Sequence, residues 1–115
     1  MGSIANKYCD KIYLTDDNPR FENPKVIRDQ IKRKIKKKKY VEISSRADAI
    51  SKAVNELNSG DVLIVAGKGH ENYQEYKKRS FFSDKLEIIK AIRKKNNLLS
   101  NSLKTNILTE TFNNK

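Results

Sequence analysis

The stretch Val62-Leu63-Ile64-Val65-Ala66-Gly67-Lys68-Gly69-His70-Glu71 decides the fold class of this chain. Its first five residues are apolar and uncharged, and they stand between a helix stop at Gly60 and a glycine-rich turn. A short apolar run in that setting is typical of a strand buried on both faces, as in a parallel sheet. We therefore expect residues 62–66 to form a buried strand, with the polar residues that follow at its carboxyl end.

Helices and strands alternate along the rest of the chain. The expected elements, in order, are a helix at 4–8, a strand at 11–15, a helix from Asn23-Pro24, a strand at 40–43, a helix from Ser44-Ser45 to Gly60, the strand at 62–66, a short edge strand at Phe81-Phe82 and a helix from Asp84. The third helix is expected to bury Ala47, Ile50, Ala53, Val54 and Leu57. This alternation predicts an α/β fold: a Rossmann-like, mostly parallel sheet flanked by helices.

A chain of 115 residues is long enough for one domain and too short for two. We expect that domain to occupy residues 1–95. Apolar periodicity fades from Asn96, so residues 96–115 are predicted to be a poorly ordered or helical tail. The sequence contains neither a membrane-spanning apolar run nor a signal peptide, and its single cysteine, Cys9, suits a reducing, cytoplasmic location.

The net charge of +11 raises the alternative of a small basic nucleic-acid-binding protein. Much of the excess lies in the run Lys32–Lys39. Aromatic residues that could stack on bases do not interleave with this run, and Lys, Asn and Ile, whose codons are rich in A and T, are all abundant. The run is therefore interpreted as a solvated helix end, and nucleic acid is disfavoured as a partner.

Two polar clusters follow predicted parallel strands. Asp16–Arg20 follows the strand at 11–15, and Gly67–Glu71 follows the strand at 62–66. Ligands of open α/β sheets bind beyond the carboxyl ends of the strands. Both clusters should therefore lie on the same edge of the sheet, and that edge is the candidate binding site.

The residue types in these clusters suit a zwitterionic ligand. Arg20 offers a planar fork for a carboxylate, Asn18 offers both a donor and an acceptor, and Glu71 could hold an ammonium group. Pro19 stiffens the first turn, and Gly67 allows a close approach of the backbone. The alternative is that Arg20 is an ordinary surface arginine and the glycines only make a tight turn.

His70 is the only histidine, and with a single cysteine this disfavours a metal site. A lone histidine beside a glycine turn is more often an orienting residue than a base. The P-loop pattern G-x-x-x-x-G-K-[ST] does not occur in the sequence, so the chain shows no phosphate cradle of that kind.

Five motifs together resemble one protein family in their order and spacing. They are Thr15-Asp16-Asp17-Asn18-Pro19-Arg20, Ser45-Arg46-Ala47-Asp48-Ala49-Ile50, Gly60-Asp61-Val62, Ala66-Gly67-Lys68-Gly69-His70-Glu71-Asn72-Tyr73-Gln74 and Phe82-Ser83-Asp84. The resemblance is to the UDP-N-acetylmuramoyl-tripeptide synthetases, the Mur ligases that add the third residue of the peptidoglycan stem, and it covers roughly residues 1 to 95.

The resemblance implies a reaction and a substrate. Such ligases use ATP and magnesium to phosphorylate the glutamate carboxylate of UDP-N-acetylmuramoyl-alanyl-glutamate, and the amine of the incoming amino acid attacks the acyl phosphate. The Asn-Pro-Arg form of the first motif is associated with meso-diaminopimelate. By this resemblance Asn18, Pro19, Arg20, Gly67 and Glu71 would bind diaminopimelate, with Asp17 and His70 as orienting residues.

Departures from the family pattern limit what the chain could do alone. The ATP-binding central domain, its magnesium ligands, the uridine-nucleotide domain and the first strand of the C-terminal domain have no counterpart here. The resemblance therefore implies a truncated ligase domain without catalytic residues or a cofactor of its own. Its expected partners are meso-diaminopimelate and, in trans, the missing ligase domains. A non-functional ligase remnant is the remaining alternative.

Overall fold

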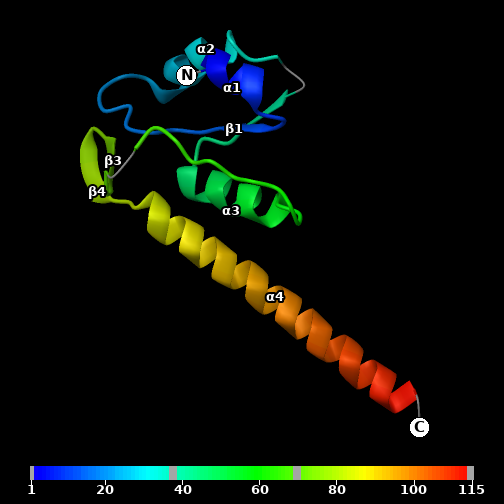
Figure 1. The fold of residues 1–115 in the computed structure, drawn as a ribbon. Coiled ribbons are helices and arrows are strands. Elements are labelled where there is room, and N and C mark those ends of the chain that lie inside the picture. The colour runs from blue at the N-terminus through cyan, green and yellow to red at the C-terminus, as the bar shows by residue number, and fades with distance from the viewer. Residues whose placement is uncertain (1, 37–38, 69–70, 114–115) are drawn as a thin grey trace.

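The computed structural model describes residues 2–36, 39–68 and 71–113. Within these ranges the elements are α1 (Gly2–Tyr8), β1 (Ile12–Leu14), α2 (Pro24–Lys32), β2 (Tyr40–Glu42), α3 (Arg46–Glu56), β3 (Tyr73–Tyr76), β4 (Lys78–Phe81) and α4 (Asp84–Asn113). Figure 1 shows α1 and α2 on one side of β1, α3 on the other side, and α4 running past α3 and away from the rest of the molecule. The chain is accordingly elongated, measuring 64 × 32 × 21 Å.

Local capping signals place the starts of two helices. The Asn23 side chain accepts a hydrogen bond from the Lys25 backbone N–H at 2.9 Å, and Pro24 opens α2. Ser45 accepts one from the Asp48 N–H at 3.3 Å, at the start of α3. Both predicted starts are confirmed. The end of α3 was predicted less exactly. The helix stops at Glu56, and Gly60, where it was expected to end, lies in the following turn with φ of +91°.

The α/β class is confirmed, but the expected mostly parallel sheet is not found in the described residues. β1 and β2 pair in parallel with Ile12 opposite Tyr40, and β3 and β4 form a separate antiparallel hairpin with Tyr73 opposite Phe81. The short edge strand expected at Phe81-Phe82 lies earlier, since β4 ends at Phe81.

The prediction of a buried strand at residues 62–66 is wrong for this chain. The segment belongs to neither sheet, and the side chains of Val62 and Ile64 are 84% and 78% exposed. A strand is buried on both faces only when neighbouring strands pair with it and helices cover it. β1 pairs only with β2 in the described part of the chain, so the apolar run has no such neighbour.

The core is small and lies mainly where α3 meets β1 and α4, with the buried apolar side chains Leu14, Ala49, Ile50, Ala53 and Val54. Ile35, which follows α2, is also buried. Three of the five residues expected on the core face of α3 are therefore buried, whereas Ala47 and Leu57 are only half-buried. Ala49, which was not among the expected core residues, is buried instead.

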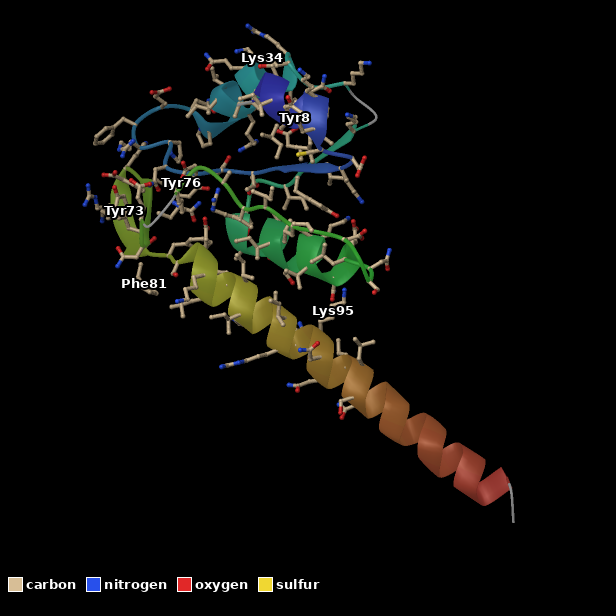
Figure 2. The ribbon with its side chains drawn as sticks, in the orientation of Figure 1. Tyr8, Lys34, Tyr73, Tyr76, Phe81 and Lys95 are labelled. Carbon is tan, nitrogen blue, oxygen red and sulfur yellow. The ribbon has the colours of Figure 1, made fainter. Side chains whose placement is uncertain are left out.

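α4 is one continuous helix that passes through the expected boundary at residue 95. Lys95 on α4 donates hydrogen bonds to the carbonyl oxygens of Val54, Asn55 and Leu57, at 2.9, 3.1 and 2.5 Å. Figure 2 shows this side chain beside the end of α3, where a cation satisfies carbonyl groups and faces the negative end of the helix dipole. The division into residues 1–95 and 96–115 stays a prediction. Among the described residues, every helix is too short or too polar to cross a membrane.

Candidate functional site

The loop after β1 and the segment around residues 67–75 meet at one edge of the molecule. Asn18 joins them: its Oδ1 accepts hydrogen bonds from Lys68 Nζ at 3.0 Å and from the Glu75 backbone N–H at 2.9 Å, while its Nδ2 donates to Glu71 Oε1 at 3.2 Å. Two of the residues singled out from the sequence, Asn18 and Glu71, are thus in direct contact although 53 residues separate them.

The carboxylate of Glu71 is held by neutral donors. Besides the amide of Asn18, the hydroxyl of Tyr73 donates to its Oε2 at 2.9 Å. Within the described residues, its side chain makes no ion pair with a lysine or arginine. A positioned carboxylate without a cationic partner is suited to receive an ammonium group from a ligand.

Arg20 follows the same loop and reaches the β3–β4 hairpin. Its backbone N–H donates to the Glu75 carbonyl at 2.8 Å, and its carbonyl accepts a hydrogen bond from the Lys77 N–H at 3.0 Å. Together these two bonds form a parallel β-bridge between Arg20 and Tyr76. These bonds hold Arg20 at φ of +56°, an uncommon conformation for a residue with a Cβ.

The guanidinium of Arg20 is half exposed and only partly used. Its Nε pairs with Glu75 Oε2 at 3.1 Å, and 53% of the side chain is exposed. In the part of the chain that the structure describes, its two terminal nitrogens have no hydrogen-bond partner. Those nitrogens form the planar fork that matches a carboxylate.

Gly67 adopts φ of +115°, and its α-carbon lies close to Asp17. A Cβ at this position would stand 3.2 Å from Asp17 Oδ2, so the turn requires glycine for both conformation and space. Pro19 lies in the turn that the Glu22 N–H closes onto the Pro19 carbonyl at 2.9 Å. The remaining sequence candidate, His70, lies outside the described residues.

Lys68 is the residue of this region that the sequence did not single out. Its side chain is fully buried, and Nζ donates to Asn18 Oδ1 and to the Tyr73 carbonyl at 2.8 Å. Nζ also lies 3.1 Å from Asp17 Oδ1 as an ion pair without hydrogen-bond geometry, and it sits over the ring of Phe82 at 5.6 Å. Lysine is almost always at the surface, so a single sequence carries no signal for its burial.

A second buried cation, Arg46, connects α4 with the two segments that carry the candidate site. It is 3% exposed, forms a two-pronged pair with Asp84, and donates to the carbonyls of Asp16 at 3.3 Å and Ala66 at 3.2 Å. The same guanidinium therefore anchors the start of the Asp16–Arg20 loop and the residue just before Gly67. Sequence reasoning placed Arg46 only within a family motif and assigned it no role.

Asp16 is buried at the base of the first loop. Its carboxylate accepts hydrogen bonds from Arg28 and from the hydroxyl of Tyr76, the latter at 2.7 Å. Burial, and then this hydrogen bond, raise the pKa of the Tyr76 phenol well above its usual range. Tyr76 therefore stays protonated as a donor and fastens the β3–β4 hairpin to the loop after β1.

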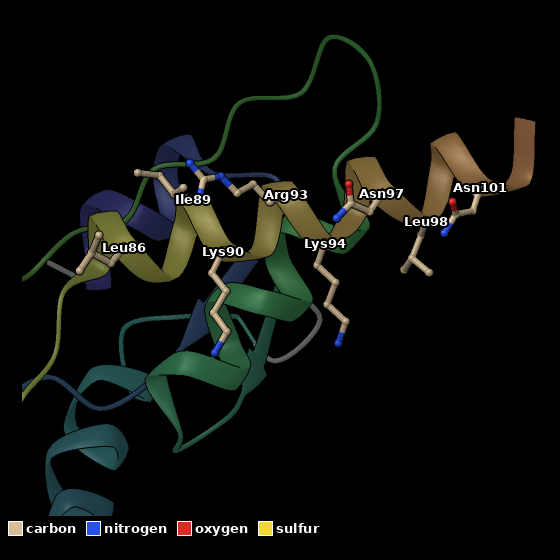
Figure 3. Close-up of a pocket in the computed structure, with 8 residues that line it drawn as sticks. All are labelled: Leu86, Ile89, Lys90, Arg93, Lys94, Asn97, Leu98 and Asn101. Atoms are coloured by element: carbon tan, nitrogen blue, oxygen red, sulfur yellow. The ribbon is translucent and has the colours of Figure 1, made fainter. Parts of the chain in front are cut away.

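Two hollows border these elements. An apolar cavity of about 300 Å³ lies between β1, α1 and α2 and reaches the Asp16–Pro19 loop and Gly67. A larger hollow of about 460 Å³ runs along α4 from Leu86 to Asn101, as Figure 3 shows. Only one helix lines the larger hollow, so it is an open groove. The convergence of charged and polar groups makes the loop edge the candidate site.

The described residues offer no metal centre and no continuous basic helix. They contain no group of three His, Cys, Asp or Glu side chains that could hold a metal ion.

The basic run Lys32–Lys39 does not form one helix, because α2 ends at Lys32. Lys32 pairs with Asp29 and Glu42, and Lys39 donates a hydrogen bond to the Asn6 carbonyl. Residues 37 and 38 of the run lie outside the described ranges.

Comparison with known proteins gives consistent matches. Residues 1–69 match the family model described as "Mur ligase, glutamate ligase domain". The chain is 48% identical over 90 residues to the UDP-N-acetylmuramoyl-L-alanyl-D-glutamate–2,6-diaminopimelate ligase of Rickettsia typhi, and 48% identical over 97 residues to that of Chlorobium phaeobacteroides. These alignments cover 78% and 84% of the chain.

A solved structure of a ligase with the same name is also similar. It shares 39% sequence identity, has a TM-score of 0.68 and covers 73% of the chain. The chain spans only 18% of that structure, and 18% and 19% of the two relatives. The match therefore concerns one part of a much longer enzyme.

Proposed function

Because the chain belongs to the Mur ligase family defined by the glutamate ligase domain, we propose that it is the amino-acid-recognition part of a diaminopimelate-adding ligase of peptidoglycan synthesis. Two observations together carry this proposal. In the described part of the chain, the terminal nitrogens of Arg20 are unpaired, and the carboxylate of Glu71 receives only neutral donors. An anion receptor and a cation receptor on one edge match a ligand end that carries both charges.

Each residue of the edge has a role in this proposal. The Arg20 fork binds the distal carboxylate of meso-diaminopimelate, and Asn18 supplies its remaining amide N–H to the same group. Glu71 binds the distal ammonium, and the backbone of Gly67 approaches the ligand because no side chain stands there. Pro19 stiffens the turn, Asp17 orients it through Lys68, and His70 is a further orienting residue.

The residues of this chain do not fit a nucleotide or magnesium site. Within the described ranges there is no cluster of metal ligands, and the sequence has no P-loop. We therefore assign no catalytic step to this chain. Activation of the glutamate carboxylate by ATP would belong to other domains of a ligase, in the cytoplasm, and the chain alone would be inactive.

A larger parallel sheet is part of the same proposal. Val62–Ala66 has the composition of a buried strand, yet Val62 and Ile64 are exposed. Strands supplied by the remaining ligase domains, in trans, would pair with this segment and restore a Rossmann-like sheet. Hydrogen exchange of the amides at 62–66 should slow when those domains are added, and unchanged exchange in a complex that does form would contradict the idea.

Titration calorimetry with meso-diaminopimelate tests the site. We expect weak binding to the wild-type chain and none to Arg20→Ala, while Lys78→Ala, an exposed lysine of β4, should bind as the wild type does. Equal binding by Arg20→Ala would reject the assigned role. Mixing the chain with ATP, magnesium, UDP-N-acetylmuramoyl-dipeptide and diaminopimelate tests inactivity, and tripeptide formation would refute it.

A further inference from the structure

Building on the proposed function, we propose that Lys68 is a positioning residue that selects for a distal carboxylate. Its buried ammonium holds the Asn18 side-chain amide in one orientation, with the oxygen inward and the nitrogen beside Glu71. The edge then presents an N–H donor, not a carbonyl, next to the ammonium receptor. Lys68 would act through Asn18, without touching the ligand itself.

The burial of Lys68 explains why its contacts are fixed. A buried ammonium must be surrounded by oxygen atoms, since an unpaired buried charge is strongly unfavourable. Lys68 Nζ has such oxygens on three residues, Asp17, Asn18 and Tyr73, all within 3.1 Å. Two of the three belong to the loop after β1, so Lys68 fastens that loop to its own segment.

The orientation of the Asn18 amide follows from its donors. Oδ1 accepts from both Lys68 Nζ and the Glu75 N–H, which uses both of its lone pairs. A flipped amide would place its NH₂ group against an ammonium and an amide N–H, and its oxygen against the carboxylate of Glu71. All three contacts would become repulsive, so the cation and the backbone donor together exclude the flip.

The fixed amide determines which ligand the edge prefers. One N–H of Nδ2 is bonded to Glu71, and the second is a donor that favours an anion. Together with the terminal nitrogens of Arg20, that donor favours an amino acid with a carboxylate at this end. L-lysine has the ammonium group without that carboxylate. Losing the amide orientation should therefore reduce the preference for meso-diaminopimelate over L-lysine.

Nuclear magnetic resonance of the full ¹⁵N-labelled chain tests the positioning role without any ligand. In the wild type we expect the Asn18 side-chain amide protons to exchange slowly with water. In Lys68→Met they should exchange at least ten-fold faster, whereas in the control Lys78→Met they should not change. An unchanged exchange rate of the Asn18 side-chain amide protons in a folded Lys68→Met chain would overturn the proposal.

A second variant covers the outcome that Lys68→Met does not fold. Asn18→Asp keeps an oxygen for Lys68 and for the Glu75 N–H but puts another oxygen in place of the nitrogen that faces Glu71. The Lys68 ammonium signal should persist, and the carboxyl carbon signal of Glu71 should shift. An unshifted Glu71 signal in the folded variant would show that the amide does not face Glu71, and the proposal would fail.

Calorimetry then measures selectivity as the ratio of the dissociation constants for L-lysine and meso-diaminopimelate. Lys68→Met should lower this ratio at least ten-fold, and Lys68→Arg, which keeps a cation, should restore part of it. An unchanged ratio would overturn the selectivity role. If the wild-type chain binds neither amino acid, the proposed function fails for the isolated chain, while the resonance experiments still decide whether Lys68 orients Asn18.

Discussion

Arg46 and Asp84 form a two-pronged ion pair, with Nε to Oδ1 and Nη2 to Oδ2 both at 2.7 Å. The pair joins the first residue of α3 to the first residue of α4, and both side chains are largely buried. The same guanidinium reaches the carbonyls of Asp16 and Ala66, so it links the helical layer to both loops of the candidate site.

We predict that Arg46→Met destabilises the chain by about 3–5 kcal/mol, because it leaves Asp84 without its cation in a largely buried position. Arg93→Met, which changes an exposed arginine of α4, should alter stability by less than about 0.5 kcal/mol. Urea denaturation followed by circular dichroism measures both. Equal stability of the two variants would contradict the structural role of Arg46.

Stability should fall in acid because of Glu42. The side chains of Lys32 and Arg28 donate hydrogen bonds to its carboxylate and lower its pKa below the ordinary value of 4.5. A depressed folded-state pKa contributes stability that is present above 4.5 and lost as the pH falls through the lower folded-state value. Thermal denaturation between pH 7 and 3 should show this loss.

The variant Glu42→Gln provides the comparison for that pH dependence. It should be less stable than the wild type at pH 7, and the difference between the two should shrink as the pH falls below 4.5. Glu22→Gln, which changes an exposed glutamate, should leave the pH profile unchanged. A constant difference between Glu42→Gln and the wild type across this range would argue against the assignment.

The two glycines with positive φ offer a matched pair. Gly60→Ala places its Cβ in open space and should cost roughly 1 kcal/mol for the backbone conformation alone. Gly67→Ala carries a similar conformational cost and also puts a Cβ 3.2 Å from Asp17 Oδ2, so it should be the more destabilising variant. Only Gly67→Ala should weaken the binding of meso-diaminopimelate; equal effects on binding would remove Gly67 from the site.

Lys95 should stabilise the end of α3. Replacing it by methionine removes three hydrogen bonds to carbonyl oxygens and should cost about 1–2 kcal/mol. Amide hydrogen exchange should quicken most at the last turn of α3. Lys94→Met, which changes the exposed neighbour, is the control, and similar exchange in both variants would show that the capping contact is unimportant.

Much of the candidate site could be predicted from the order of strands and polar motifs along the chain. Asp16–Arg20 and Gly67–Glu71 each follow a segment that reads as a parallel strand, and Asn18 and Glu71 are in contact in the structure. Lys68 and Arg46 could not be expected in their roles, because burial of a cation depends on oxygens supplied from distant parts of the chain. The roles of Arg20, Gly67 and Glu71 in ligand binding stay predictions.

Sequence by itself determined what depends on neighbouring residues. Asn23 and Ser45 begin their helices because a side-chain oxygen reaches an amide two or three residues along, which needs no partner from elsewhere. Only the tertiary structure decided whether Val62–Ala66 forms a strand. Its apolar side chains suit a buried strand, but the segment is not a strand and its side chains are partly exposed. A strand is completed only by hydrogen bonds to another strand, and the described chain brings none to its side.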